Sequence, residues 1–217
     1  MTDARGKLGG QVFSKNKGGA YVRTKVTPTN PQSADQTTVR ALFGAISQAW
    51  SALTAAQIAA WNTAVEEWKS TDIFGDLLAP TGKELHQRLN NQLQVVGGSA
   101  ITSPPAKVAL PNSPITVATI AIAATTITFT GVYTTTGTYV QVFGTTQVSN
   151  GTSFVKNKLR DIYSVDAASI VAADIWTAYV AKFGAPILGD KIFLAVKYVG
   201  LNGQASPRQT ILATVVA

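Results

Sequence analysis

The chain of 217 residues has no cysteine and only one histidine, His86. Without cysteine it can form neither a disulfide nor a thiolate metal site. Because no second histidine is available, a histidine metal site cannot be completed, and no Gly-x-Ser-x-Gly elbow indicates a serine nucleophile. A solvated His86 on a helix surface is favoured over a general base. Asp72 and Asp76 flank a glycine in a loop, which favours turn formation over cation binding. The sequence therefore predicts no catalytic residue, no cofactor and no metal, and a protein that is not an enzyme.

Charge and long apolar runs are also scarce. Charged residues make up 13% of the chain, about half the usual share, although the hydrophobic share of 46% suffices for a core. Residues 115–124, the most apolar stretch, are interrupted by Thr116 and Thr119 and are too short to span a bilayer. Residues 1–10 lack the apolar region of a signal peptide. We expect synthesis in the cytoplasm, no membrane contact, and a surface largely covered by neighbouring subunits.

The positive charge gathers at the N-terminus. Residues 1–27 hold six basic side chains against Asp3 alone, which is +5 of the total charge of +7. Two short extended segments, 11–13 and 20–26, flank the hairpin-like turn 16–19. Pro28 and Pro31 then favour an extended path toward the first helix. The segment predicts an arm that has too few apolar residues to fold alone.

The arm has three possible roles. It can be a flexible solubilising tail, or it can bind nucleic acid through phosphates, with Phe13 and Tyr21 stacking on bases. It can also bind protein by adding extended segments to neighbouring sheets. Apolar residues between the charges favour protein binding, because they are costly on a free tail. The predicted partner-binding residues are Arg5, Lys7, Phe13, Lys15, Lys17, Tyr21, Arg23 and Lys25.

Three helices are predicted after the arm, each opening with a capping box. The box pairs are Ser33 with Gln36, Thr54 with Gln57, and Thr81 with Glu84. Apolar residues recur at helical spacing behind each box, and Gly97-Gly98 ends the third helix. Trp50, Trp61 and Trp68 fall on these stripes. They form either the core of the helical unit or an interface with a partner.

The composition changes at residues 99–105, where Pro104-Pro105 follows the last helical stripe. Threonine, valine and isoleucine then predict strands at 115–121, 126–130, 139–143, 160–165, 192–199 and 210–216. Asn202-Gly203 predicts a hairpin between the last two strands. A helix over 167–183, capped by Asp166 and ended by Gly184, is inserted between strands.

These elements predict an α+β, multidomain chain. Residues 1–32 form an extended basic arm and residues 33–103 a small three-helix unit. Residues 104–217 form a β-sandwich with an inserted helix, and their final strands resemble those of immunoglobulin or fibronectin type III domains through Phe193 to Val199, Gly203 and Ser206-Pro207.

Three stretches together resemble virion structural proteins of tailed bacteriophages, including the crAss-like phages. They are Gly6-Lys7-Leu8-Gly9-Gly10-Gln11-Val12-Phe13-Ser14-Lys15-Asn16-Lys17-Gly18-Gly19, Thr27-Pro28-Thr29-Asn30-Pro31-Gln32, and Trp50-Ser51-Ala52-Leu53-Thr54-Ala55-Ala56-Gln57 with Ala60-Trp61. The resemblance covers about residues 5–95.

The resemblance implies a location in the virion and an auxiliary or decoration capsid protein that locks neighbouring subunits through its arm. Its partners would be the major capsid protein or portal and connector subunits, in a homo-oligomeric arrangement in the particle. A portal–tail connector or tail ring protein is the alternative within this class. Two alternatives are not virion structural proteins of this kind. One is a nucleic-acid-binding packaging protein that contacts DNA through the arm, and the other is a host-surface or carbohydrate-binding module.

Overall fold

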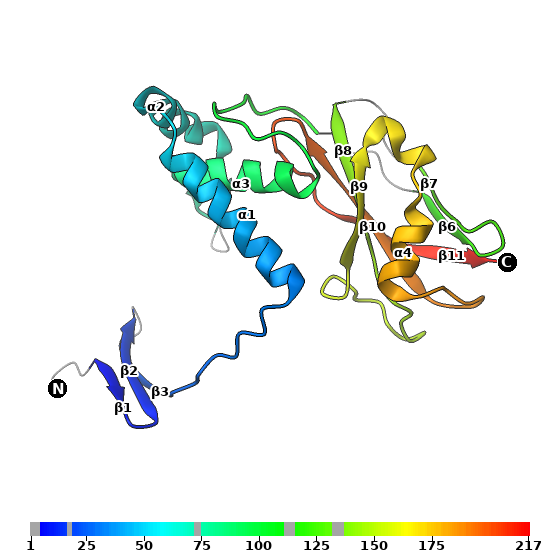
Figure 1. The fold of residues 1–217 in the computed structure, drawn as a ribbon, viewed down its shortest axis with the longest axis horizontal. Helices are drawn as coiled ribbons and strands as arrows, with labels where there is room; N and C mark the ends of the chain where they lie inside the picture. The colour runs from blue at the N-terminus through cyan, green and yellow to red at the C-terminus, as the bar shows by residue number, and fades with distance from the viewer. Residues whose placement is uncertain (1–4, 17–18, 72–74, 111–115, 132–136) are drawn as a thin grey trace. The chain divides into compact units, whose positions relative to one another are not determined.

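The computed structural model describes residues 5–16, 19–71, 75–110, 116–131 and 137–217. By its internal contacts the chain divides into two units, residues 1–39 and 40–217. The structure is mixed α+β, which confirms the predicted class (Figure 1).

The first unit contains a three-stranded antiparallel sheet in the order β1-β2-β3. Strands β2 (Gln11–Asn16) and β3 (Gly19–Thr24) pair as the predicted hairpin, although Lys17 and Gly18 lie outside the described residues. Strand β1 (Gly6–Leu8) was not predicted. It joins β2 through a turn in which Gly9 has a φ of 53°, a conformation that glycine adopts without strain.

The capping boxes begin the helices as predicted. Helix α1 (Ala34–Ser51) starts after Ser33, whose Oγ accepts a 3.4 Å hydrogen bond from the Gln36 amide. The boxes at Thr54 and Thr81 are complete and begin α2 (Ala55–Ala64) and α3 (Gly82–Val95). A 3₁₀ turn, η1 (Val65–Trp68), continues α2. The short strands β4 (Ser70–Thr71) and β5 (Leu77–Leu78) pair in the loop before α3.

Glycine ends α3 for a local reason. Gly97 has a φ of 77°, and the Gly97 and Gly98 amides donate to the carbonyl oxygens of Gln94 and Leu93 at 3.2 and 2.8 Å. This is a Schellman cap, which satisfies carbonyls that have no partner within the helix.

All six strands predicted after residue 104 are present, with small shifts at their ends. They are β6 (Val117–Ala121), β7 (Thr126–Thr130), β8 (Thr138–Gly144), β9 (Arg160–Asp166), β10 (Ile192–Gly200) and β11 (Gln209–Val216). Their order is β7-β6-β11-β10-β8-β9. The β6–β11 pair is parallel and the other pairs are antiparallel.

The predicted inserted helix is present as a 3₁₀ segment, η2 (Ala167–Ala172), followed by α4 (Ile175–Phe183). The side chain of Asp166 accepts a hydrogen bond from the Ala168 amide, so it caps this segment as predicted. Helix α4 contacts both β7 and β9, the two edge strands of the sheet. The sheet therefore curls, and α4 covers the gap between its edges.

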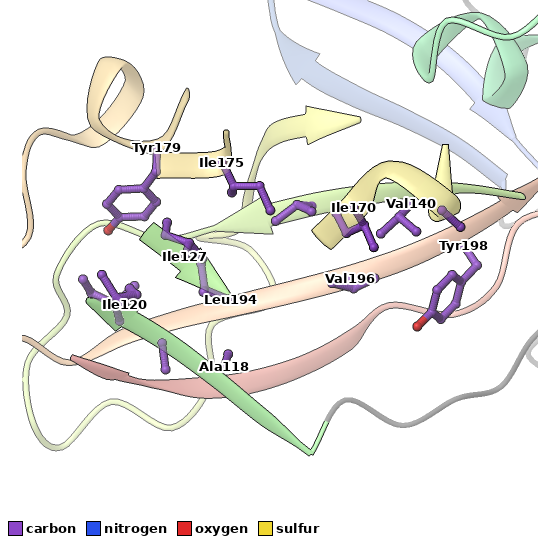
Figure 2. Close-up of a cluster of buried hydrophobic side chains, with 14 residues drawn as sticks. Ala118, Ile120, Ile127, Val140, Ile170, Ile175, Tyr179, Leu194, Val196 and Tyr198 are labelled. Carbon is purple, nitrogen blue, oxygen red and sulfur yellow. The ribbon is translucent and has the colours of Figure 1, made fainter. Parts of the chain in front are cut away.

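The main core lies inside this curl. Figure 2 shows Tyr179 and Ile175 from α4 directed toward strand residues that include Ile127 and Leu194. The Tyr179 hydroxyl also donates a 2.9 Å hydrogen bond to the Thr145 carbonyl. Packing and this hydrogen bond together hold α4 on the sheet.

The predicted immunoglobulin-like sandwich is not confirmed. A sandwich has two separate sheets, whereas the six strands here follow one continuous pairing order. The reason is that β11 pairs with both β10 and β6, which joins the β6–β7 pair and the remaining strands into one sheet. The division into 1–32, 33–103 and 104–217 stays a prediction, since contacts group residues 40–217 together.

Candidate partner-binding site

The strand register of the N-terminal sheet sorts its side chains onto two faces. Lys7, Val12 and Arg23 stand opposite one another in one cross-strand row. Phe13 and Val22 belong to the next row. Neighbouring rows point to opposite faces because successive side chains alternate along a strand. The apolar and polar residues of the arm do not alternate cleanly along the sequence, but the strand pairing shows which of them share a face.

One face of this sheet is mainly apolar. It carries Phe13 beside Val22, and also Leu8 and Ala20. Leu8 is 73% exposed and Val22 is 53% exposed. Lys15, on the same face, is the only charged side chain among the described strand residues there. Exposed apolar side chains gathered on one face are typical of a surface that a partner covers.

The opposite face is basic. Lys7 and Arg23 lie on either side of Val12, and Tyr21 lies opposite Ser14 in the next row on this same face, two residues further along β2. No acidic residue occurs in the three strands as described. This face joins two cations and an aromatic ring, the side chains that contact phosphates and bases in nucleic-acid binding.

The remaining predicted arm residues lie outside these rows. Arg5 precedes β1, and Lys25 follows β3, with its backbone amide donating a 2.7 Å hydrogen bond to the Gly10 carbonyl. Lys17 lies outside the described residues. Residues 25–33, which follow the sheet, are exposed and have no regular secondary structure, as the two prolines predict.

The three predicted tryptophans gather in the helical part. Trp61 and Trp68 are buried with Leu85 and Leu89, and Trp50 packs against them. The indole Nε1 of Trp61 donates a 2.9 Å hydrogen bond to the Thr102 carbonyl. These residues form the core of the helices, and an additional contact of Trp50 with a partner stays a prediction.

The expectation of a solvated His86 is wrong. The side chain is 2% exposed and lies between Trp50 and Trp61, with ring centroids 5.3 and 5.2 Å away in edge-to-face arrangements. Burial lowers the pKa of His86 from its ordinary value of 6.5. The sequence misled because His86 lies beside charged neighbours on the chain, while its own position on the helix faces the core.

A polar cluster that the sequence analysis did not predict lies on the outer face of the six-stranded sheet. Gln141 donates a 3.0 Å hydrogen bond to Asp161, and Lys197 donates one of 2.6 Å to Gln92 on α3. Burial raises the pKa of Asp161, opposed by the Gln141 hydrogen bond and nearby cations. Burial and the charge of Arg208 lower the pKa of Lys197, while Asp161 opposes this shift. The strand pairing brings together residues that are 20 to 56 positions apart.

The structure offers no assembled metal site in the part of the chain that it describes. No group of three or more histidine, aspartate or glutamate side chains gathers there. Of the loop residues Asp72 and Asp76, Asp72 lies outside the described residues. No described helix has the length and apolarity needed to cross a bilayer.

Comparisons with protein-family models, with curated proteins and with solved structures gave no match, so the function has to be inferred from the residues themselves.

Proposed function

We propose that this chain is a structural component of a bacteriophage virion, an auxiliary or decoration capsid protein that joins neighbouring subunits through its N-terminal arm. The observation that carries the proposal is the apolar face of the arm, on which Leu8, Ala20 and Val22 are exposed and Phe13 is half-buried. Its occupant would be a neighbouring virion protein, the major capsid protein in the first place.

The energetics of the arm support a role that depends on a partner. Three strands of three to six residues, with no buried side chain among those described, have little stability of their own. Burying a large apolar side chain contributes about 1.5–3 kcal/mol. Covering Leu8, Phe13 and Val22 would therefore supply several kcal/mol, against which the cost of ordering the arm must be set.

Two further properties support the virion as the location. The chain is poor in charge at 13%, which suits a protein covered on several sides, and its residues 5–95 resemble virion structural proteins. A structural role needs no catalytic residues. A portal–tail connector or tail ring would use the same arm, and the position of the protein in a cryo-electron map of the particle distinguishes these roles.

The basic face favours one second candidate, a nucleic-acid-binding packaging protein. Lys7 and Arg23 would contact phosphates and Tyr21 would stack on a base. The two candidates use opposite faces of the same sheet, so substitutions can separate them.

We also propose that the curled sheet is a variant of the immunoglobulin-like sandwich. The order β11-β10-β8-β9 matches strands G, F, C and C′ of such domains, and the β6–β7 pair matches A and B. Helix α4 takes the place of the remaining strands. An experimental structure of the full chain that lacked this strand order would contradict the assignment.

The test compares two double variants of the full chain. L8S/V22S changes the apolar face and K7Q/R23Q changes the basic face, and each is produced together with the other virion proteins of the encoding phage. We expect L8S/V22S to fold normally and to be incorporated into particles at least about tenfold less, because the apolar contact is lost. K7Q/R23Q should be incorporated like the unmodified chain.

The opposite pattern would contradict the capsid role. If L8S/V22S is incorporated normally while K7Q/R23Q loses a steeply salt-dependent affinity for DNA, the packaging role replaces it. Normal incorporation and unchanged DNA affinity of both variants would overturn both proposals.

A further inference from the structure

Two cations converge on one buried tryptophan in the second unit. The Arg88 guanidinium carbon lies 5.7 Å and the Lys107 Nζ lies 5.9 Å from the centroid of the Trp68 ring. Across the described ranges, neither cation has an ion pair, and Lys107 donates only a 3.2 Å hydrogen bond to the Glu67 carbonyl. Both cations line one pocket, so an anion bound there would be attracted by both positive charges.

These side chains line a cavity of about 310 Å³, which we call the tryptophan pocket. Its wall comes from η1, α3, the segment around Lys107 and the β10–β11 turn. No carboxylate lines it. The lining residues are Trp68, Lys69, Ser70, Arg88, Leu89, Gln92, Lys107, Gly203, Gln204 and Ala205.

The two glutamines of the pocket present donors as well. Gln92 Oε1 accepts from Lys197 Nζ, and Gln204 Oε1 accepts from the Val108 amide at 3.2 Å. Both partners are obligatory donors, so the oxygen and nitrogen positions of the two amides are determined. The Nε2 groups of Gln92 and Gln204 then have no acceptor in the described structure.

The Trp68 indole adds a buried donor. Trp68 is 5% exposed, and its Nε1 is buried without a hydrogen-bond partner among the described residues. A buried donor without an acceptor destabilises the folded protein. The pocket therefore combines two cations with donor groups of two glutamines and one tryptophan.

We propose that the tryptophan pocket binds an oxyanion of the phosphate class. A tetrahedral phosphate offers acceptor oxygens in several directions, which suits donors contributed by four separate segments, whereas a carboxylate offers two oxygens along one edge. The cavity is large enough for a phosphate that belongs to a larger molecule. The proposal concerns the second unit and does not depend on the role of the arm.

The test follows the four tryptophan indole N–H signals of the full chain by NMR during titration with inorganic phosphate at constant ionic strength. The variant W68F identifies the Trp68 signal. We expect that signal to shift and to saturate with phosphate, and to stay in place with sodium chloride at the same ionic strength.

Matched substitutions on α3 distinguish phosphate binding in the pocket from attraction of phosphate by the net positive charge of the protein. Arg88 and Lys83 are both exposed cations on α3, but only Arg88 lines the pocket. R88Q should weaken phosphate binding by about tenfold or more, and K83Q by less than about twofold, because only R88Q removes a positive charge that lines the pocket. A second titration with a short single-stranded oligonucleotide shows the source. If the Trp68 signal saturates at a lower concentration of oligonucleotide than of inorganic phosphate, the pocket binds a nucleic-acid phosphate. If the oligonucleotide binds equally or more weakly, the pocket binds free phosphate.

A Trp68 signal that moves linearly without saturation, or that responds equally to chloride, would overturn the proposal. Equal weakening by R88Q and K83Q would overturn it as well, because it would show that only net charge matters.

Discussion

At the scale of single residues, His86 makes the helical core sensitive to acid. It is enclosed by Trp50 and Trp61, and burial lowers its pKa in the folded protein. In the unfolded chain the imidazole binds a proton near its ordinary pKa of 6.5, while the folded form stays neutral until the pH is lower. The unfolded state then holds more protons, so stability falls as the pH decreases below about 6.5.

This effect can be measured by urea unfolding at pH 7.5 and pH 5.5, monitored by tryptophan fluorescence. We expect a lower free energy of unfolding at pH 5.5, and a smaller loss in H86L, which has no group that titrates there. An equal loss in H86L would show that His86 is not the source.

Tyr179 tests how a single side chain holds α4 to the sheet. Its ring is 1% exposed and its hydroxyl donates to Thr145. Y179F should cost about 1–3 kcal/mol, because a buried carbonyl loses its donor. Y179A should cost about 3–5 kcal/mol, because it also leaves a cavity. Urea unfolding of both variants checks these values. An unchanged free energy of unfolding in Y179F would contradict the contribution of the hydroxyl, and equal costs of the two variants would contradict that of the ring.

The same tyrosine predicts a loss of stability in alkali. Burial raises the pKa of Tyr179 to about 12, with a contribution from the charge of Asp190. Above the ordinary pKa of 10 the unfolded chain releases this proton while the folded chain keeps it, so stability decreases between about pH 10 and 12. In Y179F the decrease over this range should be smaller, as measured by urea unfolding at pH 9 and pH 11.

At the scale of elements, the β10–β11 turn lies directly against α3. Gly203 has a φ of 75°, and a Cβ added there would lie 2.9 Å from the Leu89 Cα and still closer to the Leu89 carbonyl. Gly97 has nearly the same backbone conformation, with a φ of 77° and open space around a Cβ. The two glycines therefore separate backbone strain from close packing.

We expect G97A to cost about 1–2 kcal/mol from backbone strain alone. G203A should cost at least about 2 kcal/mol more, because the helix must move away from the turn. Thermal unfolding of the two variants provides the comparison. Equal costs would show that α3 and this turn are not in close contact.

At the scale of the whole molecule, the arm and the second unit should be energetically independent. The cores around Trp61 and Ile120 lie within residues 40–217, while the arm buries no side chain among those described. Deleting residues 1–27 should therefore change the midpoint of thermal unfolding by less than about 2 °C, since no core contact is lost. A decrease of 5 °C or more, measured by calorimetry, would show that the arm stabilises the rest of the chain.

The boundaries of most elements follow from the sequence by itself. Thr54 and Thr81 cap helices with side chains that reach only three residues ahead, and Gly97 ends α3 through bonds to the preceding turn. The strands after residue 104 follow from β-branched residues and turn signals in the same way. Such interactions are local, so the order of residues determines them directly. The concentration of charge in residues 1–27 is likewise a property of the sequence.

Tertiary structure decided which faces these elements present. Strand pairing placed Leu8 on the same face of the arm as Val22 and Lys7 on the same face as Arg23, helix packing buried His86, and the curl of the sheet brought α4 against both edge strands. The tryptophan pocket arose in the same way, from Trp68, Arg88, Lys107 and Gln204 on separate segments. These features depend on contacts between residues far apart in the chain, and a shift of one residue in strand register would reverse the faces of the arm.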